Sequence, residues 1–206
     1  MYAQKLLVPA LVALATATPA HRPVQRATNS TGDGVNPALY DGSCYYPVPD
    51  TQFPDDLSEY LGRWYQVAGT FAIFTAGCQC TTADYGLNDD GTVSVLNSCK
   101  IFGLIPNEIN GTASIVDSKY GSKGAFQVSF PSVPGGGVVC PGPNYIVQKY
   151  DPNWAIVQSP SWGDLFILSR VHNPSEEDLD AWIAEAAVLG TDASSINKIT
   201  QGNCTS

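Results

Sequence analysis

A repeated pattern of short strand-like segments constrains the fold of this chain more than any other sequence feature. Eight segments combine β-branched and aromatic residues with a period of two, and turns rich in Gly, Pro, Asn and Asp separate them. The turn Asn88-Asp89-Asp90-Gly91 predicts a hairpin between the second and third segments. The segments are Trp64–Ala68, Thr81–Leu87, Thr92–Ile101, Glu108–Val116, Ala125–Phe130, Tyr145–Tyr150, Trp154–Gln158 and Leu165–Ser169.

After the last strand the apolar period changes from two to 3.6, which predicts a helix. Asn173 is expected as the N-cap, Pro174 as the first helical residue and Gly190 as the stop. One face would carry Leu179, Trp182, Ile183 and Ala186. A lone amphipathic helix should pack outside a closed sheet, because closure removes exposed edges. We therefore predict an all-β fold: an eight-stranded antiparallel up-and-down barrel with one C-terminal exterior α-helix. A short helical turn is expected before the first barrel strand, over residues 55–61.

The N-terminal segment has the pattern of a secretory signal peptide. Lys5 precedes an apolar run, Leu6–Leu14, that is too short to span a bilayer, and small residues end at Ala20. A buried N-terminal helix is the alternative, which Pro9 and the following polar stretch disfavour. We expect a signal peptide at residues 1–20, a disordered leader at 21–43, a barrel domain at 44–206, and a secreted, extracellular protein.

The cysteines fit an exported chain. An even number predicts a disulfide framework in such a protein. The spacing Cys78-Gln79-Cys80, with no histidine nearby, does not suit zinc, so no metal is expected. Asn29, Asn110 and Asn203 each begin a sequon for N-glycosylation. The six cysteines are Cys44, Cys78, Cys80, Cys99, Cys140 and Cys204.

Charge and residue types disfavour several function classes. The chain has 206 residues, a net charge of −9 and only 10 Lys and Arg residues, which argues against binding nucleic acid or anionic membranes. His172, the one histidine past the leader, follows the last strand, so a catalytic triad, a haem site or a multi-histidine metal site is not expected. Carboxylate pairs fall on turns and helix starts, where acids are common. We expect no enzyme, no cofactor and no integral membrane segment in the mature chain.

Two motifs resemble the lipocalin family. Gly62-Arg63-Trp64 on the first strand is similar to its Gly-x-Trp signature, and Leu165–Arg170 resembles its last barrel strand, which ends in arginine. A third family motif, Thr-Asp-Tyr, is replaced here by Lys149-Tyr150-Asp151. From Cys44 to Cys204 the order of elements is similar to that of the lipocalin family. Within the family the chain most resembles the group of apolipoprotein D, bacterial outer-membrane lipocalins and crustacyanins.

The resemblance implies roles for individual residues. Gly62, Trp64 and Arg170 would close the barrel floor, with the guanidinium stacked on the indole. Tyr85, Asn97 and Phe166 would contact the ligand. The implied disulfides are Cys80–Cys204, Cys44–Cys140 and Cys78–Cys99, and an exchange of Cys78 and Cys80 stays open.

The implied function is binding or transport of a small hydrophobic ligand, such as a lipid, sterol, pigment or terpenoid, in the barrel cavity. A lipocalin-fold isomerase or cyclase for an apolar substrate is the alternative, and a buried acid such as Asp84 or Glu108 beside a tyrosine would favour it. The inward residues could instead fill a collapsed barrel. Apolar loops would surround the open end and could make weak membrane contact: Phe71, Ile73, Phe74 and residues 102–106.

Overall fold

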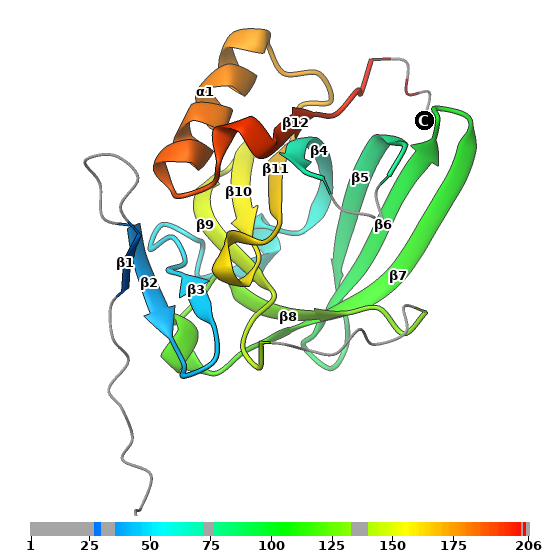
Figure 1. The fold of residues 1–206 in the computed structure, drawn as a ribbon. Coiled ribbons are helices and arrows are strands. Elements are labelled where there is room, and N and C mark those ends of the chain that lie inside the picture. Colours follow the sequence, from blue (N-terminus) through cyan, green and yellow to red (C-terminus); the bar gives the residue numbers. More distant parts are fainter. Residues whose placement is uncertain (1–26, 30–35, 72–75, 133–139, 203, 205–206) are drawn as a thin grey trace, which may run out of the picture.

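The fold is an antiparallel barrel of eight strands that follow one another in sequence order, and the eighth pairs with the first (Figure 1). The computed structural model describes residues 27–29, 36–71, 76–132, 140–202 and 204. The predicted barrel is therefore confirmed. Its strands are β4 (Gly62–Thr70), β5 (Cys78–Leu87), β6 (Val93–Ile101), β7 (Ile105–Ile115), β8 (Ala125–Ser129), β9 (Tyr145–Asp151), β10 (Trp154–Gln158) and β11 (Leu165–Ser169).

Strand register determines which side chains face the barrel interior. Trp64 pairs with Ala83, and Ala83 pairs with Asn97, so these three side chains share one face. Trp64 is fully buried in an apolar cluster, which identifies that face as the interior. The cluster contains Phe53, Tyr60, Trp64, Val93, Val95, Ala113, Phe126, Val147, Tyr150, Ala155, Val157 and Leu168. The alternation read from the sequence therefore separates an apolar inside from a polar outside.

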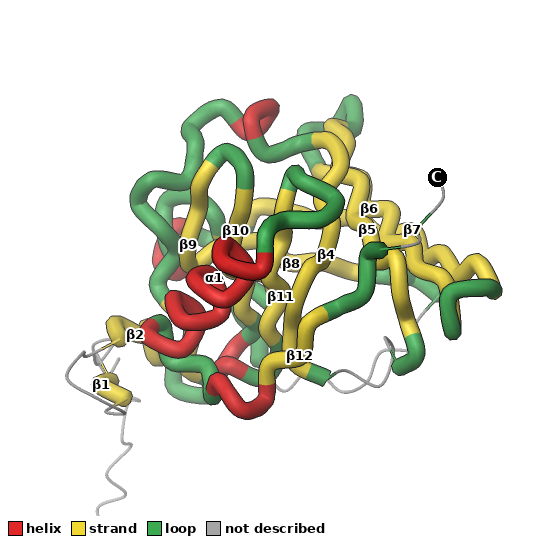
Figure 2. The backbone as a smooth tube through the Cα atoms, turned by 90° about the horizontal axis from the view of Figure 1, so that it is seen from above, coloured by secondary structure: helices red, strands yellow, loops and turns green. Residues whose placement is uncertain are grey.

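One helix, α1 (Glu176–Val188), lies outside the barrel across β9, β10 and β11 (Figure 2). Its buried face is the predicted one: Leu179 and Ala186 pack against outward residues of β4, β10 and β11, with Trp182 and Ile183 beside them. The predicted start was wrong by two residues. Ser175 is the N-cap, because its hydroxyl accepts a hydrogen bond from the Asp178 N–H.

A small sheet lies beside the barrel, built from β1 (Ala27–Asn29), β2 (Asn36–Tyr40) and β3 (Tyr45–Pro47). Disorder was predicted for residues 21–43, and for the described part of that range the prediction was wrong. The physical reason is an antiparallel ladder in which β2 pairs with both neighbours, closed beyond it by the Cys44–Cys140 disulfide. The predicted signal peptide lies outside the described residues.

The chain after α1 fills a gap in the barrel wall. β4 pairs with β5 only from Gly62 to Tyr65, and β12 (Ile196–Lys198) takes the same edge of β4 further along, from Ala68 to Thr70. The buried Gln201 amide then donates to the carbonyls of Gln66 on β4 and Thr81 on β5. We call this junction, from Gln66 to Thr70 and from Cys78 to Thr81 with residues 196–202 and Cys204, the tail seam. Its strand β12 was not predicted.

Three disulfides join the six cysteines: Cys44–Cys140, Cys78–Cys99 and Cys80–Cys204, the pairs that the resemblance implied. The Cys80–Cys204 disulfide lies within the tail seam and links β5 to the end of the tail. Short 3-10 helices occupy the connections, and the first falls inside the predicted helical turn. They are η1 (Leu57–Glu59), η3 (Ser118–Tyr120), η4 (Pro160–Trp162) and η5 (Ala193–Ser195). None of the helices in the described ranges is both long and apolar enough to cross a membrane.

A candidate ligand site inside the barrel

The closed end of the barrel is built around Arg170. Its guanidinium carbon lies 3.6 Å from the centre of the Trp64 ring. Its two Nη atoms donate to three backbone carbonyls of the chain entering β4, at 2.7 Å to Arg63, 2.8 Å to Leu61 and 3.2 Å to Glu59. Gly62 adopts a left-handed φ of 87°, which costs glycine little. Trp64 and Arg170 thus close one end of the barrel.

Above this floor, three tyrosine hydroxyls form a chain. Tyr145 Oη lies 2.7 Å from Tyr60 Oη and 3.1 Å from Tyr85 Oη. The Tyr60 and Tyr85 rings stack with centroids 5.8 Å apart, and the Tyr60 ring also contacts Trp64. We call Tyr60, Tyr85 and Tyr145 the tyrosine cluster.

The tyrosine cluster has one more hydrogen than its internal contacts use. Three hydroxyls carry three hydrogens, and the two contacts between them take two. Among the described residues no other polar atom accepts from these hydroxyls. The remaining O–H is therefore a donor without an acceptor, and a buried donor left in that condition costs about 1–3 kcal/mol.

Burial keeps these phenols neutral. It raises the pKa of Tyr85 to about 12 and raises the pKa values of Tyr60 and Tyr145 well above that of an exposed tyrosine. The neighbouring phenols strengthen the effect on Tyr145, because two phenolates cannot share a site of low polarity. The cluster therefore acts as a set of hydrogen-bond donors and acceptors, not as a charged site.

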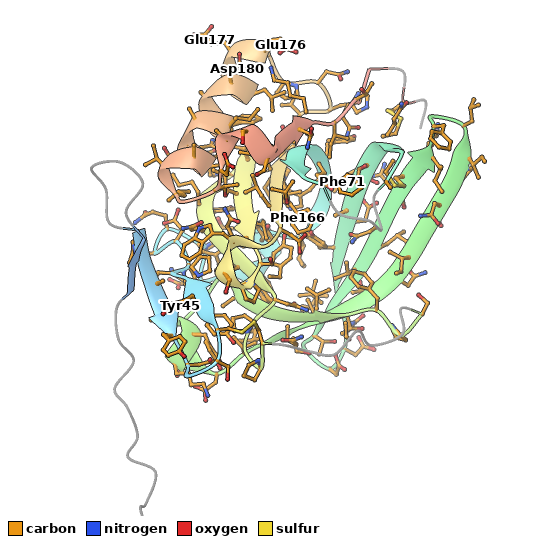
Figure 3. The ribbon with its side chains drawn as sticks, in the orientation of Figure 1. Tyr45, Phe71, Phe166, Glu176, Glu177 and Asp180 are labelled. Atoms are coloured by element: carbon orange, nitrogen blue, oxygen red, sulfur yellow. A yellow bond between two sulfur atoms is a disulfide. The ribbon has the colours of Figure 1, made fainter. Side chains whose placement is uncertain are left out.

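The three residues that the resemblance assigned to the ligand site face the interior. Tyr85 and Asn97 are on the Trp64 face. Phe166, labelled in Figure 3, pairs with Val157 and packs against the interior cluster. Asn97 and Phe166 each keep part of their surface accessible, so the barrel is not closed over them. The Asn97 Oδ1 atom itself is buried and has no hydrogen-bond partner.

Sequence reasoning missed two members of the cluster. Tyr60 lies in the predicted helical turn at 55–61, where strand alternation does not apply, and Tyr145 opens a predicted strand. For Tyr145 the signal was alternation along its strand, because it has the parity of Val147, which is buried in the interior cluster. Tyr150, from the divergent Lys149-Tyr150-Asp151 motif, also points inward, and its hydroxyl is buried without a partner.

The acids that would have favoured an enzyme lie elsewhere. Asp84 faces outward and binds Arg63, with 2.8 Å between Arg63 Nε and Asp84 Oδ1. Glu108 pairs with Ser98 on the outer face of the barrel and is exposed. His172 packs edge-on against Tyr65, an outward residue of β4. The titratable side chains that line the described interior are thus tyrosines.

Exposed apolar residues gather at the end opposite the floor. Phe71 follows β4, while Phe102 and Leu104 form the β6–β7 turn, and they are 69%, 73% and 81% exposed. The Phe102 N–H donates to the Gly77 carbonyl at 2.8 Å, which joins the two loops. Ile73 and Phe74, expected at the same rim, lie outside the described residues. The end opposite the floor therefore has an apolar rim.

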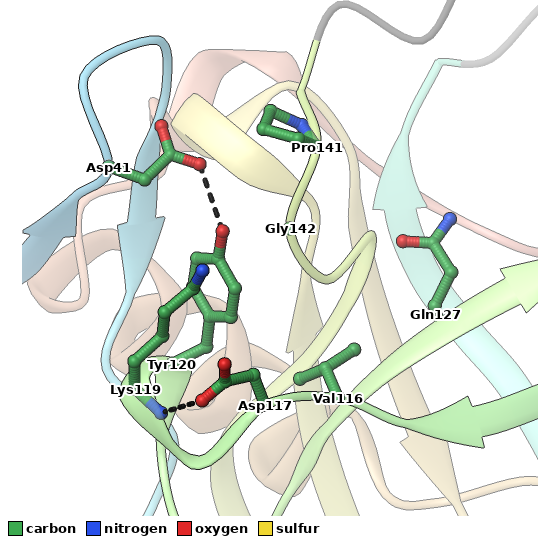
Figure 4. Close-up of a pocket in the computed structure, with 8 residues that line it drawn as sticks. All are labelled: Asp41, Val116, Asp117, Lys119, Tyr120, Gln127, Pro141 and Gly142. Carbon is green, nitrogen blue, oxygen red and sulfur yellow. Dashed lines mark hydrogen bonds between the residues drawn. The ribbon is translucent and has the colours of Figure 1, made fainter.

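A hollow of about 510 Å³ lies outside the barrel, between the small sheet and the β7–β8 connection (Figure 4). Asp41 lines it, and its carboxylate accepts from the N–H groups of Ser43 and Cys44 and from the hydroxyls of Tyr46 and Tyr120. Desolvation opposes ionisation of Asp41, but these hydrogen bonds outweigh it and lower its pKa. Since its lone pairs are already used, Asp41 fastens the small sheet to the barrel and is not a ligand anchor.

Comparisons with known proteins agree with this arrangement. The chain is 31% identical to temperature-induced lipocalin-1 of Arabidopsis thaliana over 151 residues, covering 72% of this chain and 80% of that protein. It is 32% identical to apolipoprotein D of Mus musculus over 131 residues, covering 63% and 62%. Lobster apocrustacyanin A1 has a similar fold, with a TM-score of 0.56 at 18% identity over 74% of this chain and 82% of that one. A family profile described as a lipocalin-like domain matches residues 55–201, so the chain belongs to the lipocalin family.

Proposed function

We propose that the protein is a secreted carrier that holds one small apolar molecule in its barrel and does not transform it. Members of its family typically bind small hydrophobic ligands. The apolar interior, the apolar rim and the outward position of Asp84 and Glu108 support binding over catalysis. Three disulfides and the signal-like N-terminus support an extracellular location.

The tyrosine cluster also indicates which chemical group the ligand carries. Its spare O–H needs an acceptor, and Asn97 Oδ1 needs a donor. A hydrocarbon offers neither and would leave both groups unpaired at a cost. A hydroxyl offers both, since its oxygen accepts and its hydrogen donates. We therefore propose that the ligand is an apolar molecule with a hydroxyl group, oriented by Tyr85 and Asn97 and packed against Phe166.

Matched ligands test this assignment. We expect a long-chain alcohol to quench tryptophan fluorescence and to bind more tightly than the alkane of equal length. Tyr85→Phe should weaken the alcohol by about 0.5–1.5 kcal/mol, the net value of one neutral hydrogen bond, and leave the alkane unchanged. Asn97→Leu should tighten the alkane, because it removes an unpaired amide from an apolar surface. Equal losses for both ligands would contradict the anchoring role.

A broader test addresses binding itself. The protein purified from its own secretory source should carry a lipid that native mass spectrometry detects, or it should respond to a panel of lipophilic ligands. A barrel that is empty and unresponsive in both measurements would overturn the proposed function.

A further inference from the structure

The strand β7 has one edge without a strand partner. β6 pairs with it along almost its whole length, from Ile105 to Ala113. β8 pairs with it only from Thr112 to Ile115, so among the described residues no strand covers the β8 side from Ile105 to Gly111. Continuing the register would place Pro131 opposite Asn110, and proline has no N–H to extend the ladder. An unpaired edge invites pairing with a second chain.

Asn110 stands on this edge and points away from the barrel. Its neighbours Ile109 and Gly111 pair with the inward residues Asn97 and Val95, so Asn110 belongs to the opposite face. It pairs with Leu96, which pairs in turn with the outward Asp84. Asn110 is exposed, and no described group forms a hydrogen bond with its amide.

The sequence around Asn110 is an acceptor sequon, Asn110-Gly111-Thr112. Thr112 lies two residues further along the strand and shares the outward face. Gly111 must be small, because a Cβ there would lie 2.5 Å from the Phe130 ring. A large group on Asn110 would project outward and meet neither the barrel interior nor Phe130.

We propose that Asn110 carries an N-linked oligosaccharide that shields the unpaired edge of β7. The inference rests on the proposed secretion, since the reaction belongs to the secretory route. The donor is an oligosaccharide on a lipid diphosphate. A bond forms between Asn110 Nδ2 and the anomeric carbon, the carbon–oxygen bond to the diphosphate breaks, and the diphosphate leaves with the electron pair while the amide loses one hydrogen to a base. The product is a bulky, hydrated cover over Leu96 and the strand edge.

Other features of the edge agree with this role. Pro106 removes one donor from the edge and Glu108 adds a charge, which are two devices that discourage strand pairing. Both protect the part near the β6–β7 turn. The segment around Ile109 and Gly111 has neither, and Asn110 lies between them.

Peptide mapping of the full chain, secreted from a eukaryotic host and treated with peptide-N-glycosidase, tests the modification. We expect conversion of Asn110 to aspartate in most of the secreted protein. Asn110→Gln and Thr112→Ala should each lose the same glycan mass, and the matched control Thr112→Ser should keep it. Secreted protein with an unmodified Asn110 would overturn this inference and leave secretion standing. A chain retained in the cell with an uncleaved N-terminus would overturn the proposed secretion and this inference with it.

Sedimentation at increasing protein concentration tests the shielding. Asn110→Gln should self-associate where the glycosylated protein and Asn29→Gln stay monomeric. The second change is Ile105→Lys, because Ile105 lies on the same edge and is 61% exposed, so its charge would stay in solvent. Added to Asn110→Gln, it should restore the monomer. If Asn110→Gln sediments as the wild type does at every concentration, the glycan does not protect the edge.

Discussion

At the scale of single residues, Trp64 and Arg170 connect the floor to the rest of the barrel. The indole is fully buried, its Nε1 donates to the Tyr60 carbonyl at 2.9 Å, and the Arg170 guanidinium covers its face. We expect Trp64→Ala to lower the free energy of unfolding by about 3–5 kcal/mol, the range for truncating a large buried side chain. Chemical denaturation measures the change, and Phe71→Ala at the exposed rim is the control with almost no effect. A Trp64→Ala protein as stable as wild type would refute the floor role.

The order of the tyrosine cluster predicts unequal effects of removing single hydroxyls. Tyr145 is the central member, and its hydroxyl contacts both others. Tyr145→Phe leaves two hydroxyls without partners. Tyr85→Phe removes only the hydroxyl at one end of this hydrogen-bonded series and leaves the Tyr60–Tyr145 contact in place. We expect Tyr145→Phe to cost about 1–3 kcal/mol of unfolding free energy, and Tyr85→Phe to cost less or nothing. Equal effects of the two variants in urea denaturation would show that the hydroxyls do not act as a chain.

The tyrosines also predict how stability depends on alkaline pH. The pKa of Tyr85 is about 12 in the folded protein and 10.0 for an exposed phenol, so the unfolded chain releases this proton first. Below pH 10 both states keep the proton and the contribution is constant. From there to about pH 12 the free energy of unfolding should fall by about 1.4 kcal/mol per pH unit for this one group. Tyr85→Phe should reduce that slope, which urea denaturation at a series of alkaline pH values measures. Parallel slopes for Tyr85→Phe and wild type would contradict the prediction.

At the scale of elements, the tail seam replaces strand pairing with the chain that follows α1. Beyond Tyr65 no β5 residue pairs with β4, and the Gln201 amide and the Cys80–Cys204 disulfide bridge the two strands. We expect the double variant Cys80→Ser/Cys204→Ser to speed hydrogen exchange at 66–70 and 78–82 and to leave 62–65 protected. Cys44→Ser/Cys140→Ser is the control for losing a disulfide at the other side of the barrel. Faster exchange spread evenly over the whole barrel would show that the tail does not close this seam specifically.

Some elements could be predicted from the sequence and others could not, for physical reasons. All eight barrel strands and the buried face of α1 follow from apolar periodicity, because each element buries one side. β12 was missed since Ile196–Lys198 has too few residues to show a period, and only its pairing with β4 makes it a strand. The helix start was misplaced because Asn173, Pro174 and Ser175 all favour helix starts, and only the Ser175 hydrogen bond decides between them. β1 and β2 depend on partners that local sequence does not reveal.

The interior site was predictable in part. The resemblance supplied Tyr85, Asn97 and Phe166, which are inward on regular strands. It did not supply Tyr60 and Tyr145, which meet Tyr85 from the segment before β4 and from the start of β9. Convergence of three phenols from three distant segments is a property of the closed barrel. Periodicity along one strand cannot report it.

At the scale of the whole molecule, the tail seam has a consequence for the order in which the protein is made. Residues 196–202 and Cys204 complete the wall between β4 and β5, and the Cys80–Cys204 bond spans 124 residues. These residues are synthesised after all eight barrel strands. During translation the facing edges of Gln66–Thr70 on β4 and Cys78–Thr81 on β5 therefore lack their tail partners. Contacts this distant in sequence form slowly, and strand edges that stay unpaired during folding are prone to pair with other chains. The pairing of β11 with β4 can form before the tail is made, but the seam between β4 and β5 is complete only after residue 204 has been added.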